Sequence, residues 1–99
     1  MLNSKQRAKL RGIANTMETI LIIGKGGIDE NVVKQADEAL EKREMFKGKV
    51  LETCEINARE AAAELTEKTH SESVQVIGQK FVLYRRNPNP KKRVIELDD

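Results

Sequence analysis

The chain has 99 residues, of which 38% are hydrophobic and 34% are charged, a size and balance that predict one soluble globular domain. No apolar run is long enough to cross a membrane, and the N-terminal segment is polar and basic, so we expect neither a membrane helix nor a signal peptide. A single cysteine, Cys54, excludes an internal disulfide framework and favours a reducing cytoplasm.

The net charge of +2 hides an uneven distribution along the chain. Residues 1–28 carry five basic side chains and one acidic, residues 29–72 carry seven and twelve, and residues 73–99 carry six and three. Segregation of this kind predicts a basic face and an acidic face instead of an evenly mixed surface.

Caps and hydrophobic spacing predict the first three elements. Asn3 or Ser4 can cap a helix over residues 4–16, whose apolar stripe has basic residues on both flanks. The apolar run at residues 19–23 predicts a buried strand. Asp29 can cap a second helix that ends near residue 43 and has a charged outer face.

The second half of the chain repeats these signals. Residues 45–53 predict a second strand. Asn57 followed by Glu60 is close to a capping box and opens a third helix that reaches about residue 69. Residues 74–78 and 80–85 predict two short strands joined as a hairpin.

The resulting order, α-β-α-β-α-β-β, predicts a fold of the broad α/β class. We expect a two-layer α+β arrangement, in which the helices pack against a small four-stranded mixed sheet. Residues 1–87 are expected to form a single domain. Residues 88–99 contain Pro88 and Pro90 and little apolar content, and we expect them to be an extended or disordered tail.

The most informative motif is Gly24-Lys25-Gly26-Gly27, which lies between the first strand and the second helix. A Walker A loop needs Ser or Thr after its lysine, and a dinucleotide fingerprint needs a glycine where Asp29 stands. The remaining pattern, G-x-x-G, is the form used by modules that clamp a nucleic-acid backbone, with the following helix N-terminus as a further anion site. A tight turn with a solvated lysine is the alternative interpretation.

Other chemistry finds little support in the sequence. His70 has no second histidine or cysteine nearby, and Cys54 is better explained as a small structural residue. The glutamates of the third helix are typical of a solvated face, and Tyr84 suits the core at least as well as a stacked base. We therefore expect no catalytic residue, no metal site and no cofactor.

Two segments together carry a resemblance to a known family. They are residues 20–28, Ile-Leu-Ile-Ile-Gly-Lys-Gly-Gly-Ile, and residues 76–85, Val-Ile-Gly-Gln-Lys-Phe-Val-Leu-Tyr-Arg, preceded by a basic first helix. Over residues 3–87 the chain resembles the bacterial YhbY proteins, the free-standing form of the CRM domain (chloroplast RNA splicing and ribosome maturation). The resemblance implies RNA binding, association with precursors of the large ribosomal subunit, and a fold like the C-terminal domain of translation initiation factor 3. It also matches Gly24–Gly27 to the family's G-x-x-G loop.

The sequence thus predicts a cytoplasmic, monomeric RNA-binding protein that is not an enzyme, with ribosomal RNA as its partner. Loop amides and Lys25 would hold phosphates, and nearby basic residues would enlarge the positive field. The residues predicted to contact RNA are Lys5, Arg7, Lys9, Arg11, Gly24, Lys25, Gly26, Gly27, Lys80, Arg85 and Arg86. The alternative is a protein-interaction module that docks a basic ribosomal protein on the acidic outer faces of the second and third helices.

Overall fold

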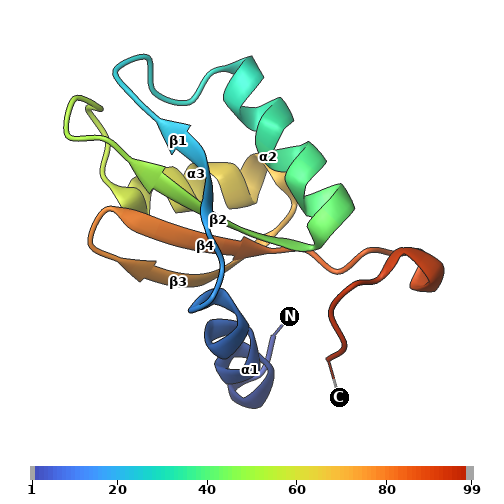
Figure 1. Cartoon of the computed structure of the whole chain (residues 1–99). Coiled ribbons are helices and arrows are strands. Elements are labelled where there is room, and N and C mark those ends of the chain that lie inside the picture. Colours follow the sequence, from blue (N-terminus) through green and yellow to red (C-terminus); the bar gives the residue numbers. More distant parts are fainter. Residues whose placement is uncertain (1, 98–99) are drawn as a thin grey trace.

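A four-stranded mixed sheet forms the centre of the protein, as a computed structural model that describes residues 2–97 shows (Figure 1). The first residue of the predicted domain and the last two of the predicted tail lie outside the described residues. The predicted order of helices and strands is confirmed, and so is the fold class. The elements are α1 Ser4–Ala14, β1 Thr19–Ile23, α2 Glu30–Arg43, β2 Met45–Val50, α3 Ala58–Thr69, β3 Glu72–Ile77, β4 Lys80–Tyr84 and a short 3₁₀ helix, η1, Pro90–Lys92. No helix within residues 2–97 is long and apolar enough to cross a membrane.

Side-chain caps start the three α-helices at the predicted positions. Asn57 Oδ1 accepts a hydrogen bond from the Glu60 amide at 2.8 Å, and Glu60 Oε1 accepts one from the Asn57 amide at 3.1 Å. Asn3 forms the same capping box with Gln6 at the start of α1. Asp29 caps α2 by accepting from the Val32 amide at 2.9 Å. These local bonds satisfy donors that every helix start leaves free, which is why the sequence predicts them well.

The strands are ordered β1-β2-β4-β3 across the sheet. β1 and β2 are parallel and connected by α2, whereas β4 is antiparallel to both β2 and β3. This topology brings three segments to one end of the sheet: the exit of β1, the exit of β2 and the β3–β4 turn. Two backbone bonds join them, from Leu51 N to Ile23 O at 2.9 Å and from Val50 N to Gln79 O at 2.8 Å.

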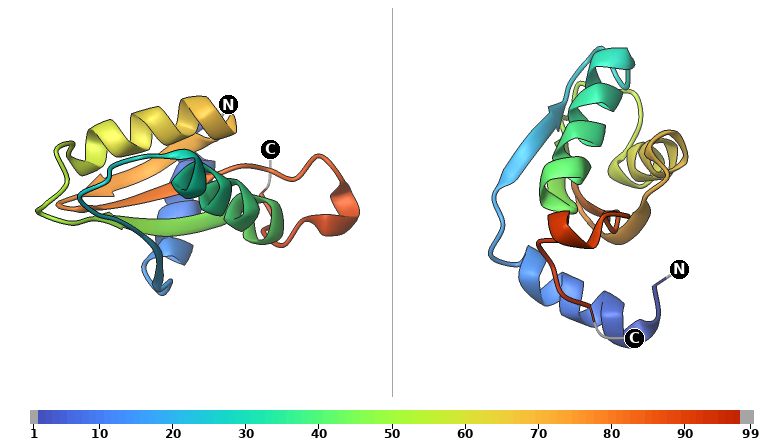
Figure 2. Two further views of the ribbon diagram at one scale, coloured as in Figure 1. Left: turned by 90° about the horizontal axis from the view of Figure 1, so that it is seen from above. Right: turned by 90° about the vertical axis from the view of Figure 1, so that its right-hand side faces the viewer.

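The two faces of the sheet carry separate apolar clusters. On one face α2 and α3 cover the alternate strand residues that include Phe46, Phe81 and Leu83. The Phe46 and Phe81 rings meet edge to face, with centroids 6.2 Å apart. On the other face α1 packs near the Met45 and Tyr84 end of the strands, away from α2 and α3 (Figure 2). The second helical layer covers only part of its face, because α1 is short and lies at one end.

The segment after residue 87 differs from the expected extended or disordered tail. It turns through η1 and folds back toward α1, where Leu97 is buried in the second cluster (Figure 1). Its anchor is Glu44, a fully buried carboxylate whose two oxygens accept hydrogen bonds from the backbone amides of Asn87, Val94 and Ile95 at 2.6, 2.7 and 3.0 Å. The prolines suppress regular structure here, but a distant carboxylate supplies the missing bonds.

Candidate nucleic-acid interface

The G-x-x-G segment is a tight exposed turn between β1 and α2. The Gly27 amide donates to the Gly24 carbonyl at 3.0 Å, which leaves Lys25 and Gly26 at the exposed tip. Gly27 has φ of +68°, a backbone conformation that favours glycine. A methyl group on Gly24 would only meet Leu51 at an ordinary 3.6 Å.

Gly26 is the position that the fold does not explain. Its φ is not positive, and a Cβ placed on it would meet nothing within 4 Å. Neither backbone strain nor internal packing therefore requires glycine there. Its remaining physical value is that a bare backbone lets an external group approach the amides closely.

The start of α2 is less suited to phosphate than the sequence indicated. Asp29 occupies the Val32 amide with its own carboxylate, and Glu30 adds a second exposed acid in the first turn. Two negative charges at this helix start oppose a bound anion, although they favour the helix itself. The exposed turn with Lys25 is therefore better suited to an anion than the helix N-terminus that follows it.

The basic residues of α1 lie at the opposite end of β1 from the turn. Five residues of β1 separate the two regions, or about 16 Å at ~3.3 Å per residue. Lys5 and Lys9 are exposed, whereas Arg7 and Arg11 are half-buried. Arg7 donates from Nη1 to the Ser73 carbonyl, so it also fixes α1 to β3.

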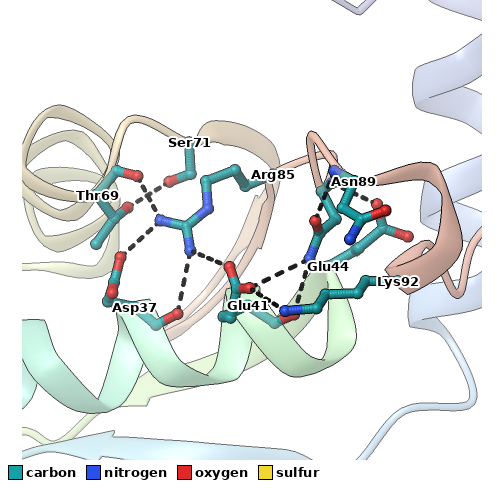
Figure 3. A network of polar contacts seen from close by, with 9 residues as sticks. Asp37, Glu41, Glu44, Thr69, Ser71, Arg85, Asn89 and Lys92 are labelled. Atoms are coloured by element: carbon teal, nitrogen blue, oxygen red, sulfur yellow. Dashed lines mark hydrogen bonds and ion pairs between the residues drawn. The ribbon is translucent and has the colours of Figure 1, made fainter.

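The three basic residues predicted in and after β4 have different surroundings. Lys80 is exposed at the same sheet end as the turn, and Arg86 is exposed at the α1 end. Arg85 lies on the α2 and α3 side. Its Nη1 donates to Asp37 Oδ1 at 2.6 Å and to the Thr69 carbonyl at 2.8 Å (Figure 3). Arg85 is thus used to tie β4 to both helices, and the structure does not bring it together with the other predicted contacts.

Sequence reasoning missed two lysines that the sheet places between these regions. Lys47 and Lys49 lie two residues apart on β2, on the face that α2 and α3 leave open. Lys47 pairs in register with Thr19 at the start of β1, and Lys49 pairs with Ile22 near its end. The alternation Met-Phe-Lys-Gly-Lys-Val already placed both lysines on one face of a strand, which was the signal available.

Tyr84 is a core residue and not a surface for base stacking. It is 2% exposed and belongs to the cluster under α1. Burial, and then the nearby Glu44 charge, raise the pKa of its hydroxyl above 10.0. Among residues 2–97, no group of three or more His, Cys, Asp or Glu side chains is arranged to hold a metal ion.

Comparison with known proteins identifies the family. A model of the CRS1 / YhbY (CRM) domain matches residues 2–85. The chain belongs to the CRM domain family. The matched range contains the G-x-x-G turn and both lysines of β2, and the family resemblance noted in the sequence is confirmed.

Relatives of this CRM domain match over nearly their whole length. The "Probable RNA-binding protein YqeI" of Bacillus subtilis is 40% identical over 92 residues, which are 93% of this chain and 96% of that protein. The "Probable RNA-binding protein PA4753" of Pseudomonas aeruginosa is 29% identical over 93 residues, 94% of this chain and 89% of that protein. The solution structure of the hypothetical protein SAV1595 from Staphylococcus aureus is 44% identical, with a TM-score of 0.77, and covers 97% of this chain and 100% of its own. None of these names describes an enzyme.

Proposed function

We propose that this CRM domain binds structured RNA through the backbone of its G-x-x-G turn, and that its target is ribosomal RNA in cytoplasmic precursors of the large subunit. The observation that carries the proposal is Gly26, an exposed glycine that neither strain nor packing requires. Lys25 beside it supplies the cation, and the amides of the turn are the donors. The RNA-binding names of the relatives support the class of ligand.

Recognition then depends on RNA shape more than on sequence. Phosphate contacts position a protein on RNA but carry little base information. The core holds both phenylalanines and the tyrosine, so aromatic stacking on bases is not offered by the described surface. The phosphate contacts and the buried aromatic rings both fit a monomer that holds the backbone of a folded RNA.

The alternative, docking of a basic protein on the acidic helices, has less support. Asp37 and Glu41 of α2 face Arg85, and Glu64 of α3 pairs with Lys68 at 3.1 Å. Part of the acidic surface is thus already neutralised within the chain. Binding to protein-free RNA separates the two functions, because only the first requires it.

The test uses two glycines that are equally free of steric contacts. Gly26→Ala and Gly26→Asp should fold as the wild type, because Gly26 is exposed and a Cβ placed there meets nothing within 4 Å. Gly12→Ala on α1 is the matched control, since Gly12 is also exposed and without near contacts. Binding is measured by gel shift with a protein-free transcript of large-subunit ribosomal RNA.

We expect Gly26→Asp to weaken binding more than tenfold, because it brings a negative charge to the phosphate contact, where one released counterion is worth about sixfold at 0.1 M salt. Gly26→Ala should have a smaller effect and Gly12→Ala none. Equal affinity of all four proteins would refute the clamp. Co-sedimentation of the tagged protein with large-subunit precursors tests the ribosomal part separately.

A further inference from the structure

A row of four side chains crosses the whole sheet on the face opposite α2 and α3. Register pairs Ile22 of β1 with Lys49 of β2, Lys49 with Lys80 of β4, and Lys80 with Ile77 of β3. Residues in register lie on the same face, so the row reads Ile-Lys-Lys-Ile from edge to edge. Ile22 and Ile77 are 60% and 64% exposed, Lys80 is exposed and Lys49 is half-buried, so α1 leaves the row accessible.

The fold gives no reason for two lysines in the middle of this row. Lys49 and Lys80 are direct cross-strand partners, with Cβ atoms expected about 4.5–5.5 Å apart, and like charges at such positions are destabilising. Within residues 2–97 no ion pair involves either lysine, or Lys47 on the same face. Within the same residues, the carboxylates that do form ion pairs belong to α2 and α3, on the other side of the sheet.

A cavity next to the row continues this surface toward α1. It has a volume of about 140 Å³, and its lining includes Lys47, Lys80, Gln75 and Asn15, the residue that follows α1. Two ammonium groups and two amides are the side chains that proteins use to bind phosphate and ribose oxygens. The row and the cavity together span the gap between the G-x-x-G turn and α1.

We propose that this open face is a second RNA-backbone site, in which Lys47, Lys49 and Lys80 hold phosphates of the same RNA that the G-x-x-G turn contacts. The row begins at Ile22, two residues before Gly24, so the two sites are continuous. The inference rests on the proposed function and adds a path for the RNA from the turn across the sheet to α1.

The chemistry of the face favours a polyanion over other occupants. A second copy of this chain would bring the same lysines against each other, and a basic protein would be repelled. A flexible polyanion can place one phosphate near each ammonium group, which removes the like-charge repulsion that the free protein carries. An anionic membrane also carries negative charge, and the experiment therefore includes binding to anionic vesicles.

The experiment compares Lys49→Gln/Lys80→Gln with Lys34→Gln/Lys42→Gln. Both double variants remove two positive charges, but Lys34 and Lys42 are exposed on α2, on the other side of the sheet. At 0.1 M salt, two lost phosphate contacts correspond to about a 40-fold loss of affinity, and the log–log salt slope should become shallower by about 1.4–1.8. The control should stay within about threefold of the wild type.

Each outcome decides the proposal. If both double variants bind RNA equally well while Gly26→Asp does not, the turn works alone and the open-face site is refuted. If the wild type itself does not bind the transcript, the proposed function fails, and the open-face site, which is proposed for the same RNA, is refuted with it. If Lys49→Gln/Lys80→Gln loses sedimentation with phosphatidylserine vesicles but keeps RNA affinity, the face is a membrane site and the proposal is wrong. Thermal melts show that the variant folds, because removing a like-charge pair should not lower its stability.

Discussion

Removing the carboxylate of Glu44 should detach the C-terminal segment while the rest of the domain stays folded. Its Oε1 accepts the amides of Val94 and Ile95, and its Oε2 accepts that of Asn87. No nearby segment can replace these bonds, because Glu44 is fully buried at the end of α2. Glu44→Ala would leave one buried amide, that of Asn87, and two part-buried amides, those of Val94 and Ile95, without partners. An unsatisfied buried amide costs about 1–3 kcal/mol, and a part-buried one costs less.

The variant does not lose the summed energy of these amides, because the segment can detach from the surface and its amides can then form hydrogen bonds with water. The cost is then limited to what docking contributes, mainly the burial of Leu97, which is about 1.5–3 kcal/mol, together with the lost bonds. We therefore expect Glu44→Ala to lower the free energy of unfolding by about 2–4 kcal/mol. Glu44 has φ of +62°, so Glu44→Gly should be about 1 kcal/mol more stable than Glu44→Ala.

Urea unfolding measures the stability, and limited trypsin digestion at Lys91, Lys92 and Arg93 measures detachment. Glu41→Ala is the matched control, because Glu41 lies in the last turn of α2, next to Glu44, and is exposed. Its side chain makes only long contacts, with Arg85 and Lys92 at 3.9 Å and with Asn87 at 3.5 Å. Such pairs contribute about 0–1 kcal/mol. If Glu44→Ala unfolds at the control's midpoint and is cleaved at the control's rate, the anchoring role is wrong.

Three further single substitutions test other parts of the structure. Tyr84→Phe should leave stability at neutral pH unchanged or raised, because the buried hydroxyl has no hydrogen-bond partner among the described residues. Since the pKa of Tyr84 is raised in the folded state, wild-type stability should fall as pH rises above about 10, and urea titrations should show a weaker fall in Tyr84→Phe. Gly48→Ala should cost about 1–3 kcal/mol in the same assay, because its methyl would collide with the Phe81 ring. Lys25→Ala should reduce the salt slope of RNA binding by about 0.7–0.9, and an unchanged slope would exclude Lys25 as a phosphate contact.

Local signals account for what the sequence predicted well. Caps such as Asn57 with Glu60, and the apolar run of β1, act within a few residues, so they place these elements to within about two residues. The predicted second strand has no such end signal, and β2 ends at Val50, three residues before the predicted residue 53. The G-x-x-G turn is equally local. Local sequence signals were therefore enough to predict the fold class. They were also enough to predict the exposed turn at Gly26, where a bare backbone allows another molecule to approach closely.

Long-range pairing accounts for what the sequence missed. Nothing near Arg85 indicated that Asp37, 48 residues away, would take its guanidinium. In the same way, the composition of the tail gave no sign that Glu44 would hold it. Which face α1 covers was not predictable either, because its apolar stripe fits either face of a sheet with two apolar clusters.

The sheet explains how a chain with a net charge of only +2 can offer a surface to RNA. Alternation along β2 sends Phe46 and Val50 to the α2 and α3 side and Lys47 and Lys49 to the other. The acids concentrate on α2 and α3, where several pair with basic residues of the same side. The electrostatic field at a surface depends on where the charges lie as well as on their sum, and the sheet separates the lysines of the open face from the acids of α2 and α3. The same separation predicts that charge changes on α2 alter solubility more than RNA affinity.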